Sequence, residues 1–232
     1  NDLNGAASDF DKCISKDAKN EYYQAHYYLG GIYFELEEYD KAIIAYDKTI
    51  KLKPDFAAAY NDRGSVYRMK NEYQEALNNY RMAIKYDPKM AYAYNNMASV
   101  KKKMGDFKGA ISDYTSAIQY KPDYYIAYNN RGTVYMEQGD FDNALKDFSK
   151  AIEINKDYTF AYNNRGNLKY KQKRYQDAIK DYNMAIQIDP DYGFAYMNRG
   201  IAKEMMRDND GACKDWQKAY ALGVKNAGKY VQ

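Results

Sequence analysis

The sequence predicts an all-α solenoid of tandem antiparallel helix pairs, and three observations support this prediction. First, variants of the hexapeptide AYNNRG recur six times, at 25–30, 59–64, 93–98, 127–132, 161–166 and 195–200. Second, successive copies begin 34 residues apart. Third, apolar residues between the copies recur at helical rather than alternating spacing. A fixed period of this length is typical of repeat architectures, in which neighbouring units stack because none can bury its apolar face alone.

Each unit is predicted to contain two helices joined by a tight turn, as the unit at 125–158 illustrates. Its first half places apolar residues from Ile126 to Tyr135 on one helical face. Gly139 then ends that helix and Asp140 can cap the next one. The second half, from Phe141 onward, is again amphipathic.

Small residues fix the register of the repeat. One position of the first helix holds Gly30, Gly64, Ala98, Gly132, Gly166 and Gly200. One position of the second helix holds Ala42, Ala76, Ala110, Ala144, Ala178 and Ala212. The gap between the helices is predicted to be filled by Tyr46, Tyr80, Tyr114, Phe148, Tyr182 and Trp216. Four second helices are predicted to end at Pro54, Pro88, Pro122 and Pro190.

The period divides the chain into six full units with partial elements at both ends. The predicted units are 23–56, 57–90, 91–124, 125–158, 159–192 and 193–226. Residues 1–22 are predicted to carry the second helix of a truncated N-terminal repeat, with a two-residue offset around Glu21 and Tyr22. Residues 227–232 are expected to begin a capping helix.

Composition narrows the class of protein. The net charge of +3 is too small to indicate a nucleic-acid or membrane-surface partner. No run of 18 apolar residues exists, so membrane insertion is not expected. Cys13 and Cys213 are interpreted as small core residues. The compartment stays open, with the cytoplasm slightly favoured and a removed targeting signal still possible.

The sequence offers no arrangement of residues suited to catalysis. Its one histidine, His26, replaces a repeat tyrosine and is interpreted as structural. The motifs of phosphate-binding loops, dinucleotide sites, zinc proteases and serine hydrolases are missing. Aspartates recur once per unit rather than in pairs, at Asp113, Asp147, Asp181 and Asp215. The sequence therefore predicts no enzyme, cofactor or metal.

These aspartates are predicted to pair with the arginine of the next AYNNRG copy. Asp147 would then bind Arg165 and staple a first helix to the preceding second helix. The same rule pairs Asp113 with Arg131 and Asp181 with Arg199.

The 34-residue period, small first-helix residue, second-helix alanines and terminal prolines resemble the tetratricopeptide repeat (TPR) family. The resemblance covers nearly the whole chain. It implies a right-handed superhelix whose concave groove is lined by the first helices. It also implies that the second asparagine of each AYNNRG copy faces this groove, where related asparagine ladders in O-GlcNAc transferase grip the backbone of extended peptides.

The matching asparagines here are Asn96, Asn130, Asn164 and Asn198. Tyr28 stands at this position in the first predicted unit and Asp62 in the second. The preceding residues Asn61, Asn95, Asn129 and Asn163 are expected to border the groove. Family geometry adds Tyr92, Ile126, Phe160 and Phe194 near its mouth, and Arg68, Lys102, Lys103, Tyr170 and Lys171 further along. An amide both donates and accepts hydrogen bonds, so it can pair with any peptide unit. Alternatively, these asparagines hydrate the surface or link neighbouring helices.

The sequence thus predicts a non-catalytic scaffold that binds an extended peptide or protein segment. Two alternatives remain: a structural module that associates with its own copies, and the targeting arm of a larger enzyme.

Overall fold

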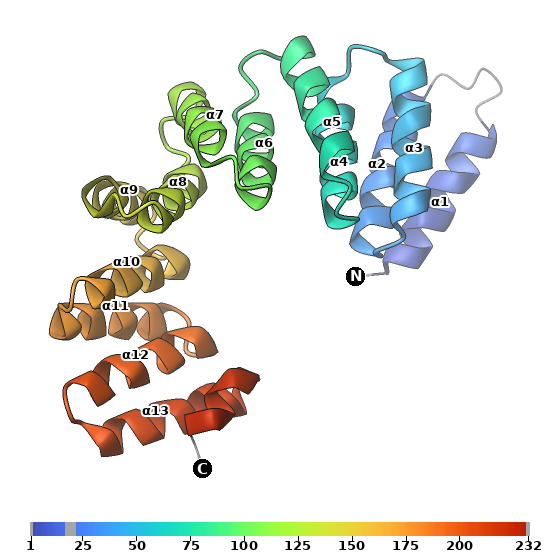
Figure 1. The fold of residues 1–232 in the computed structure, drawn as a ribbon. Helices are drawn as coiled ribbons and strands as arrows, with labels where there is room; N and C mark the ends of the chain where they lie inside the picture. The colour runs from blue at the N-terminus through green and yellow to red at the C-terminus, as the bar shows by residue number, and fades with distance from the viewer. Residues whose placement is uncertain (1, 17–21, 231–232) are drawn as a thin grey trace. The chain divides into compact units, whose positions relative to one another are not determined.

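A computed structural model describes residues 2–16 and 22–230 of the chain, and these residues form helices joined by short turns. The helices are α1 (Leu3–Lys16), α2 (Tyr23–Glu35), α3 (Tyr39–Leu52), α4 (Ala57–Met69), α5 (Tyr73–Tyr86), α6 (Ala91–Lys103), α7 (Phe107–Tyr120), α8 (Tyr125–Glu137), α9 (Phe141–Ile154), α10 (Thr159–Lys171), α11 (Tyr175–Ile188), α12 (Gly193–Met205), α13 (Asn209–Ala221) and the 3₁₀ helix η1 (Lys225–Tyr230). The predicted all-α solenoid of helix pairs is confirmed (Figure 1).

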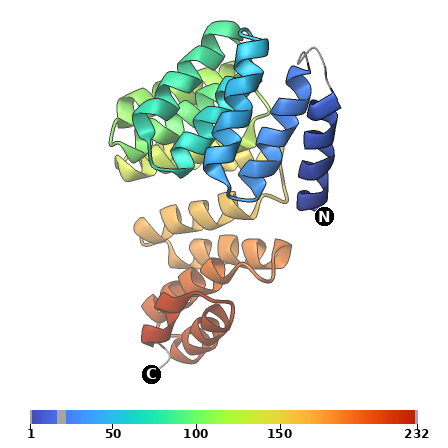
Figure 2. The same ribbon diagram turned by 90° about the vertical axis from the view of Figure 1, so that its right-hand side faces the viewer.

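The chain divides into two compact units, Asn1–Pro122 and Asp123–Gln232, called unit 1 and unit 2 below. In unit 1, α2 pairs with α3, α4 with α5, and α6 with α7; in unit 2, α8 pairs with α9, α10 with α11, and α12 with α13. Within each unit, a second helix also packs on the next first helix, as the successive layers of α10 to α13 show in Figure 2. First helices of neighbouring pairs approach each other as well, so they share one side of each unit, called the first-helix face below.

The turn inside each pair follows the predicted chemistry. Gly105 and Gly139 have φ values of 82° and 79°, a left-handed conformation that favours glycine. Asp106 and Asp140 then cap the following helices through their side chains. Lys173 occupies the corresponding turn position of another pair with a φ of 61°, so there a residue with a Cβ adopts the same conformation.

The predicted close approach of paired helices at the small residue is also confirmed. A Cβ added to Gly166 would lie 2.5 Å from Cε1 of Tyr182, and one added to Gly200 would lie 2.5 Å from Nε1 of Trp216. The aromatic residue therefore occupies the space that a side chain at the glycine would need. Most of these aromatics are almost fully buried and form the core of each pair.

The two ends of the chain differ from the regular repeats. At the C-terminus, η1 begins at Lys225, two residues before the predicted capping helix, and Tyr230 stacks on Trp216 with ring centroids 4.6 Å apart. At the N-terminus, α1 packs on α2, and Ala7 is a buried residue of α1. Residue 21, where the two-residue offset was expected, lies outside the described residues.

The interpretation of both cysteines as core residues is wrong for Cys13, which is exposed on α1, while Cys213 is half-buried on α13. Cys13 is exposed because, among the described helices, α1 packs substantially on α2 alone. Separately, none of the described helices combines the length and apolar character needed to cross a bilayer.

Candidate functional site

The arginines of the AYNNRG copies in unit 2 bind aspartates of their own repeat. Nε and Nη2 of Arg131 each donate to one carboxylate oxygen of Asp147, both at 2.8 Å. Arg165 forms the same fork with Asp181 at 2.9 and 2.8 Å, and Arg199 repeats it with Asp215. The carboxylates are nearly buried, with side-chain exposures of 5–7%. A planar guanidinium and a carboxylate match geometrically in this bidentate arrangement.

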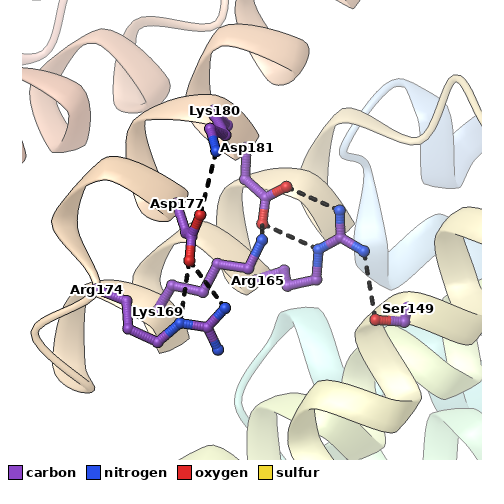
Figure 3. Close-up of polar contacts among 7 residues, drawn as sticks. All are labelled: Ser149, Arg165, Lys169, Arg174, Asp177, Lys180 and Asp181. Carbon is purple, nitrogen blue, oxygen red and sulfur yellow. Dashed lines mark hydrogen bonds and ion pairs between the residues drawn. The ribbon is translucent and has the colours of Figure 1, made fainter.

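The predicted pairing of Arg165 with Asp147 is therefore wrong, because Arg131 already binds Asp147. Arg165 does reach the preceding second helix, but through its remaining nitrogen. Nη1 donates to Oγ of Ser149 at 3.3 Å, two residues beyond the predicted partner (Figure 3). The prediction failed because each of these arginines has one aspartate 18 residues before it and another 16 residues after it in the sequence. Periodicity alone does not show which of the two it binds.

Lysines one turn after the arginine strengthen two of these forks. Nζ of Lys169 lies 2.7 Å from Asp181, and Nζ of Lys203 lies 2.8 Å from Asp215. Figure 3 shows Lys169 and Arg165 reaching the same carboxylate. These ion pairs join α10 to α11 and α12 to α13, and each of the two carboxylates pairs with both an arginine and a lysine.

Unit 1 departs from this pattern. Arg63 donates through Nε to the neutral Oδ1 of Asn79 at 2.7 Å and reaches Asp47 through Nη1. The next copy has Met97 in place of the arginine, and Lys101 alone lies 2.6 Å from the buried Asp113. Burial raises the pKa of the Asp113 carboxyl above its usual value even though Lys101 opposes this shift.

The asparagines form a ladder of amide–amide hydrogen bonds. In each case Nδ2 of the second asparagine donates to Oδ1 of the first asparagine one repeat earlier. The distances are 3.1 Å for Asn96 to Asn61, 2.9 Å for Asn164 to Asn129, and 2.9 Å for Asn198 to Asn163. The ladder thus links neighbouring first helices within each unit.

The two asparagines of a copy differ in burial. Asn95, Asn129 and Asn163 are 5–6% exposed, whereas Asn96, Asn130, Asn164 and Asn198 are half-buried. A side-chain amide has two N–H donors and two acceptor lone pairs, so one ladder bond leaves capacity for another partner. The second asparagines are therefore held in a fixed orientation, and their binding role stays a prediction.

Three aromatic residues predicted near the groove mouth are exposed. Tyr92, Phe160 and Phe194 expose 51%, 51% and 56% of their surface. In unit 2, Phe160 packs against Tyr192 with ring centroids 5.3 Å apart in an edge-on arrangement. Exposed aromatics at one repeat position provide apolar surface to a ligand that crosses several repeats.

Unit 1 carries a pocket of about 570 Å³ on its first-helix face. Its lining comes from Tyr27, Gly31, Phe34, Glu35, Tyr46, Ala58, Asn61, Asp62, Ser65, Arg68, Met90, Tyr92 and Asn96. Four of the residues predicted to line or border the groove thus meet in one place: Asn61, Arg68, Tyr92 and Asn96. Lys102 is half-buried and Lys103 and Lys171 are exposed, and none of the three lines this pocket. Tyr170 in unit 2 is half-buried and packs its ring on Tyr175.

Asp62 is the most unusual group in the pocket, because it occupies the position of the second asparagine. Its carboxylate accepts hydrogen bonds from Oη of Tyr27 at 2.6 Å and from Nδ2 of Asn61 at 2.9 Å. Both donors are neutral, and no ion pair links Asp62 to any described residue. Burial raises the pKa of the Asp62 carboxyl, while these two hydrogen bonds oppose the shift. Burial also raises the pKa of the Tyr27 hydroxyl, and the hydrogen bond to Asp62 and its negative charge raise this pKa further.

The sequence did not identify Tyr27, Phe34 and Glu35 as site residues. Their signal was a departure from the repeat pattern: Tyr27 and Glu35 stand in the atypical AHYYLG copy and its helix end. His26 lies in the same helix, half-buried, and lines a separate pocket with Leu29 and Ile44. The described residues contain no cluster of His, Cys, Asp and Glu side chains able to hold a metal ion.

Stacked antiparallel helix pairs define the class of helical repeat proteins. Models of the tetratricopeptide repeat match residues 125–158 and 159–192, and a TPR repeat model matches 30–70, 64–105 and 99–139. These matches extend over residues 30–192, more than half of the chain. The chain belongs to the tetratricopeptide repeat family, whose repeats indicate a protein–protein interaction scaffold.

Solved structures share the fold at low sequence identity. The Cut9–Hcn1 APC/C hetero-tetramer matches with a TM-score of 0.83 and 15% identity over 99% of this chain and 46% of that chain. The chain thus spans less than half the length of that relative. PilF of Pseudomonas aeruginosa matches with a TM-score of 0.77 and 20% identity over 87% and 92% of the two chains.

A third structure, YrrB, is described as a TPR protein with an unusual peptide-binding site. It matches with a TM-score of 0.60 and 23% identity over 82% of this chain and 96% of that chain. No curated protein sequence matches the chain significantly.

Proposed function

We propose that the protein is a non-catalytic scaffold that binds an extended peptide or protein segment along its first-helix face. The observation that carries the proposal is the row of half-buried asparagines held by amide–amide bonds at one repeat position. A preorganised amide can pair with the C=O and N–H of a peptide unit without losing much side-chain entropy.

Exposed aromatics support the same proposal. Tyr92, Phe160 and Phe194 stand one turn before the ladder asparagines on α6, α10 and α12. They would supply apolar contact to a chain whose backbone the amides bind. The description of YrrB as a peptide-binding TPR protein supports this use of the fold.

Selection of a random-peptide display library on the full chain tests the proposal. Peptides selected on the wild-type chain should bind a Tyr92→Ala/Phe160→Ala/Phe194→Ala variant at least about tenfold more weakly, because exposed aromatic anchors contribute strongly to peptide binding. These side chains are about half exposed, so their removal should leave the fold intact by far-UV circular dichroism.

The matched control removes exposed apolar groups from second helices. An Ile44→Ala/Tyr220→Ala variant loses side chains that are 60% and 56% exposed on α3 and α13. Its affinity for the selected peptides should equal that of the wild type. Retained binding by the first variant together with lost binding by the control would contradict the proposal, and a library that yields no binder would do so as well.

A further inference from the structure

The pocket in unit 1 contains charged side chains that form no ion pair with any described residue. Asp62 and Glu35 contribute two carboxylates and Arg68 contributes one guanidinium. No ion pair among the described residues involves any of the three side chains. Two negative charges and one positive charge leave the pocket with a net negative charge.

Asp62 occupies a position that the repeat gives to a neutral amide. A half-buried carboxylate without a cationic partner is unfavourable, because neutral hydrogen bonds replace only part of the hydration that it loses. Asn96, one repeat later, shows that an asparagine fits the corresponding place and still serves the ladder. Asp62 keeps a hydrogen bond to the preceding first helix by accepting from Oη of Tyr27, but neither this bond nor the one from Asn61 neutralises its charge. Ionisable groups in such surroundings concentrate at functional sites.

The ends of the helices affect the charges of Glu35 and Arg68 in different ways. Glu35 is the last residue of α2, where its negative charge adds to the partial negative charge of the helix C-terminus. Arg68 lies in the last turn of α4, where the helix end partly compensates its positive charge. Nε of Arg68 is buried without a hydrogen-bond partner, so a ligand in the pocket cannot reach this nitrogen. The two carboxylates outnumber the guanidinium, so the net charge of the pocket is negative.

The walls of the pocket are aromatic. Tyr27, Phe34, Tyr46 and Tyr92 line it, and Tyr92 is half exposed at its edge. Aromatic ring faces carry negative potential and attract ammonium and guanidinium groups. Aromatic walls around carboxylates suit a cation and disfavour an anion.

We propose that this pocket binds a lysine or arginine side chain of an extended partner segment, with Asp62 and Glu35 pairing with its charge. The proposal rests on the proposed peptide-binding function and names the chemistry that one part of the first-helix face recognises. The half-buried amide of Asn96 would hold the backbone beside the basic residue.

The test selects the same random-peptide display library on three forms of the full chain: wild type, Asp62→Asn and Asp9→Asn. Asp62→Asn introduces the residue that other repeats carry at this position. Asp9→Asn removes one negative charge from a side chain that is 77% exposed on α1. Peptides from the wild type and from Asp9→Asn should be enriched in lysine or arginine at one position, and peptides from Asp62→Asn should lose this enrichment.

A second measurement uses one selected peptide with arginine at the enriched position and its analogue with citrulline, the neutral isostere of arginine. The wild type should bind the arginine peptide about tenfold more tightly, as expected for a charge-assisted pair, and Asp62→Asn should bind both equally. Arg68→Gln should strengthen binding of the arginine peptide, because it removes the one opposing charge.

Three results would overturn the inference. They are selected peptides without basic enrichment, equal affinity of the wild type for the two peptides, and enrichment in acidic residues that disappears in Arg68→Gln. In each case peptides still bind, so the proposed function stands while the inference fails. A library without any binder would instead remove the proposed function and, with it, this inference.

Discussion

Units 1 and 2 use the same repeat but satisfy its polar positions differently. In unit 2, three successive arginines each form a bidentate fork with a buried aspartate, and the ladder positions hold asparagine. In unit 1, one arginine meets the neutral Asn79, another is replaced by Met97, and one ladder position holds Asp62.

The difference shows which polar positions of the repeat are satisfied by ion pairs within the protein and which are not. Where the repeat pattern is complete, the arginine of each copy pairs with a buried aspartate. Where the pattern breaks, as at Asp62, a half-buried carboxylate is left with neutral donors inside a pocket. We therefore propose that departures from the repeat, as at Asp62, add to the binding face that the repeated asparagines are proposed to form.

The largest expected effect concerns the forks. Arg131→Leu should lower the free energy of unfolding by about 3 kcal/mol, because it leaves Asp147 buried without its cation. Arg63→Leu should cost only about 1 kcal/mol, because its buried partner Asn79 is neutral. Urea denaturation followed by far-UV circular dichroism gives both values. Equal losses for the two variants would contradict the distinction between the units.

The second expected effect has the opposite sign. Asp62→Asn should raise the free energy of unfolding by about 1 kcal/mol at neutral pH, because it removes a half-buried charge without a cationic partner. The pKa of Asp62 is raised in the folded protein, so the folded state holds the proton more tightly than the unfolded state does. The wild type therefore loses stability as pH rises from the unfolded pKa through the folded pKa.

The gain from Asp62→Asn should accordingly be largest above the folded pKa and fade as the solution is acidified to about pH 4, near the ordinary pKa of aspartate. Thermal unfolding of both forms at neutral and acidic pH measures this dependence, with Asp9→Asn as the control for net charge. A gain that stays constant with pH would show that the charge of Asp62 is not its cause.

The smallest expected effect concerns the turns. Lys173→Gly should stabilise the protein by about 0.5 kcal/mol, because lysine is strained at a φ of 61° while glycine is not. Gly139→Ala at a φ of 79° should destabilise it by about 1 kcal/mol. Urea denaturation again measures both changes. A loss of stability in Lys173→Gly would mean that the lysine side chain makes a contact that outweighs the backbone strain.

The fold could be predicted from the sequence because small residues recur in register. Gly166 and Ala178 leave room for Tyr182, and this requirement returns in each repeat as a visible pattern. The turn at Gly139 and Asp140 was predictable for the same reason, since a positive φ and a helix cap each favour particular residues.

The polar contacts were only partly predictable. Periodicity showed that Arg165 needs an aspartate but could not choose between Asp147 and Asp181, which depends on how two helices face each other. The pocket around Asp62 was harder still, because it combines Tyr27, Phe34 and Glu35, which the repeat pattern does not mark. The replacement of asparagine by Asp62 was visible in the sequence, but its burial and the absence of a cationic partner were not.

Hydrogen exchange of the full chain, with and without a peptide selected from the library, tests most directly whether the pattern break in unit 1 marks the binding site. Binding at the pocket predicts slower amide exchange in α2, α4 and α6 near Asp62 when the peptide is present, and no such change in Asp62→Asn at the same peptide concentration. Protection confined to the second helices, or protection near α4 that persists unchanged in Asp62→Asn, would contradict it.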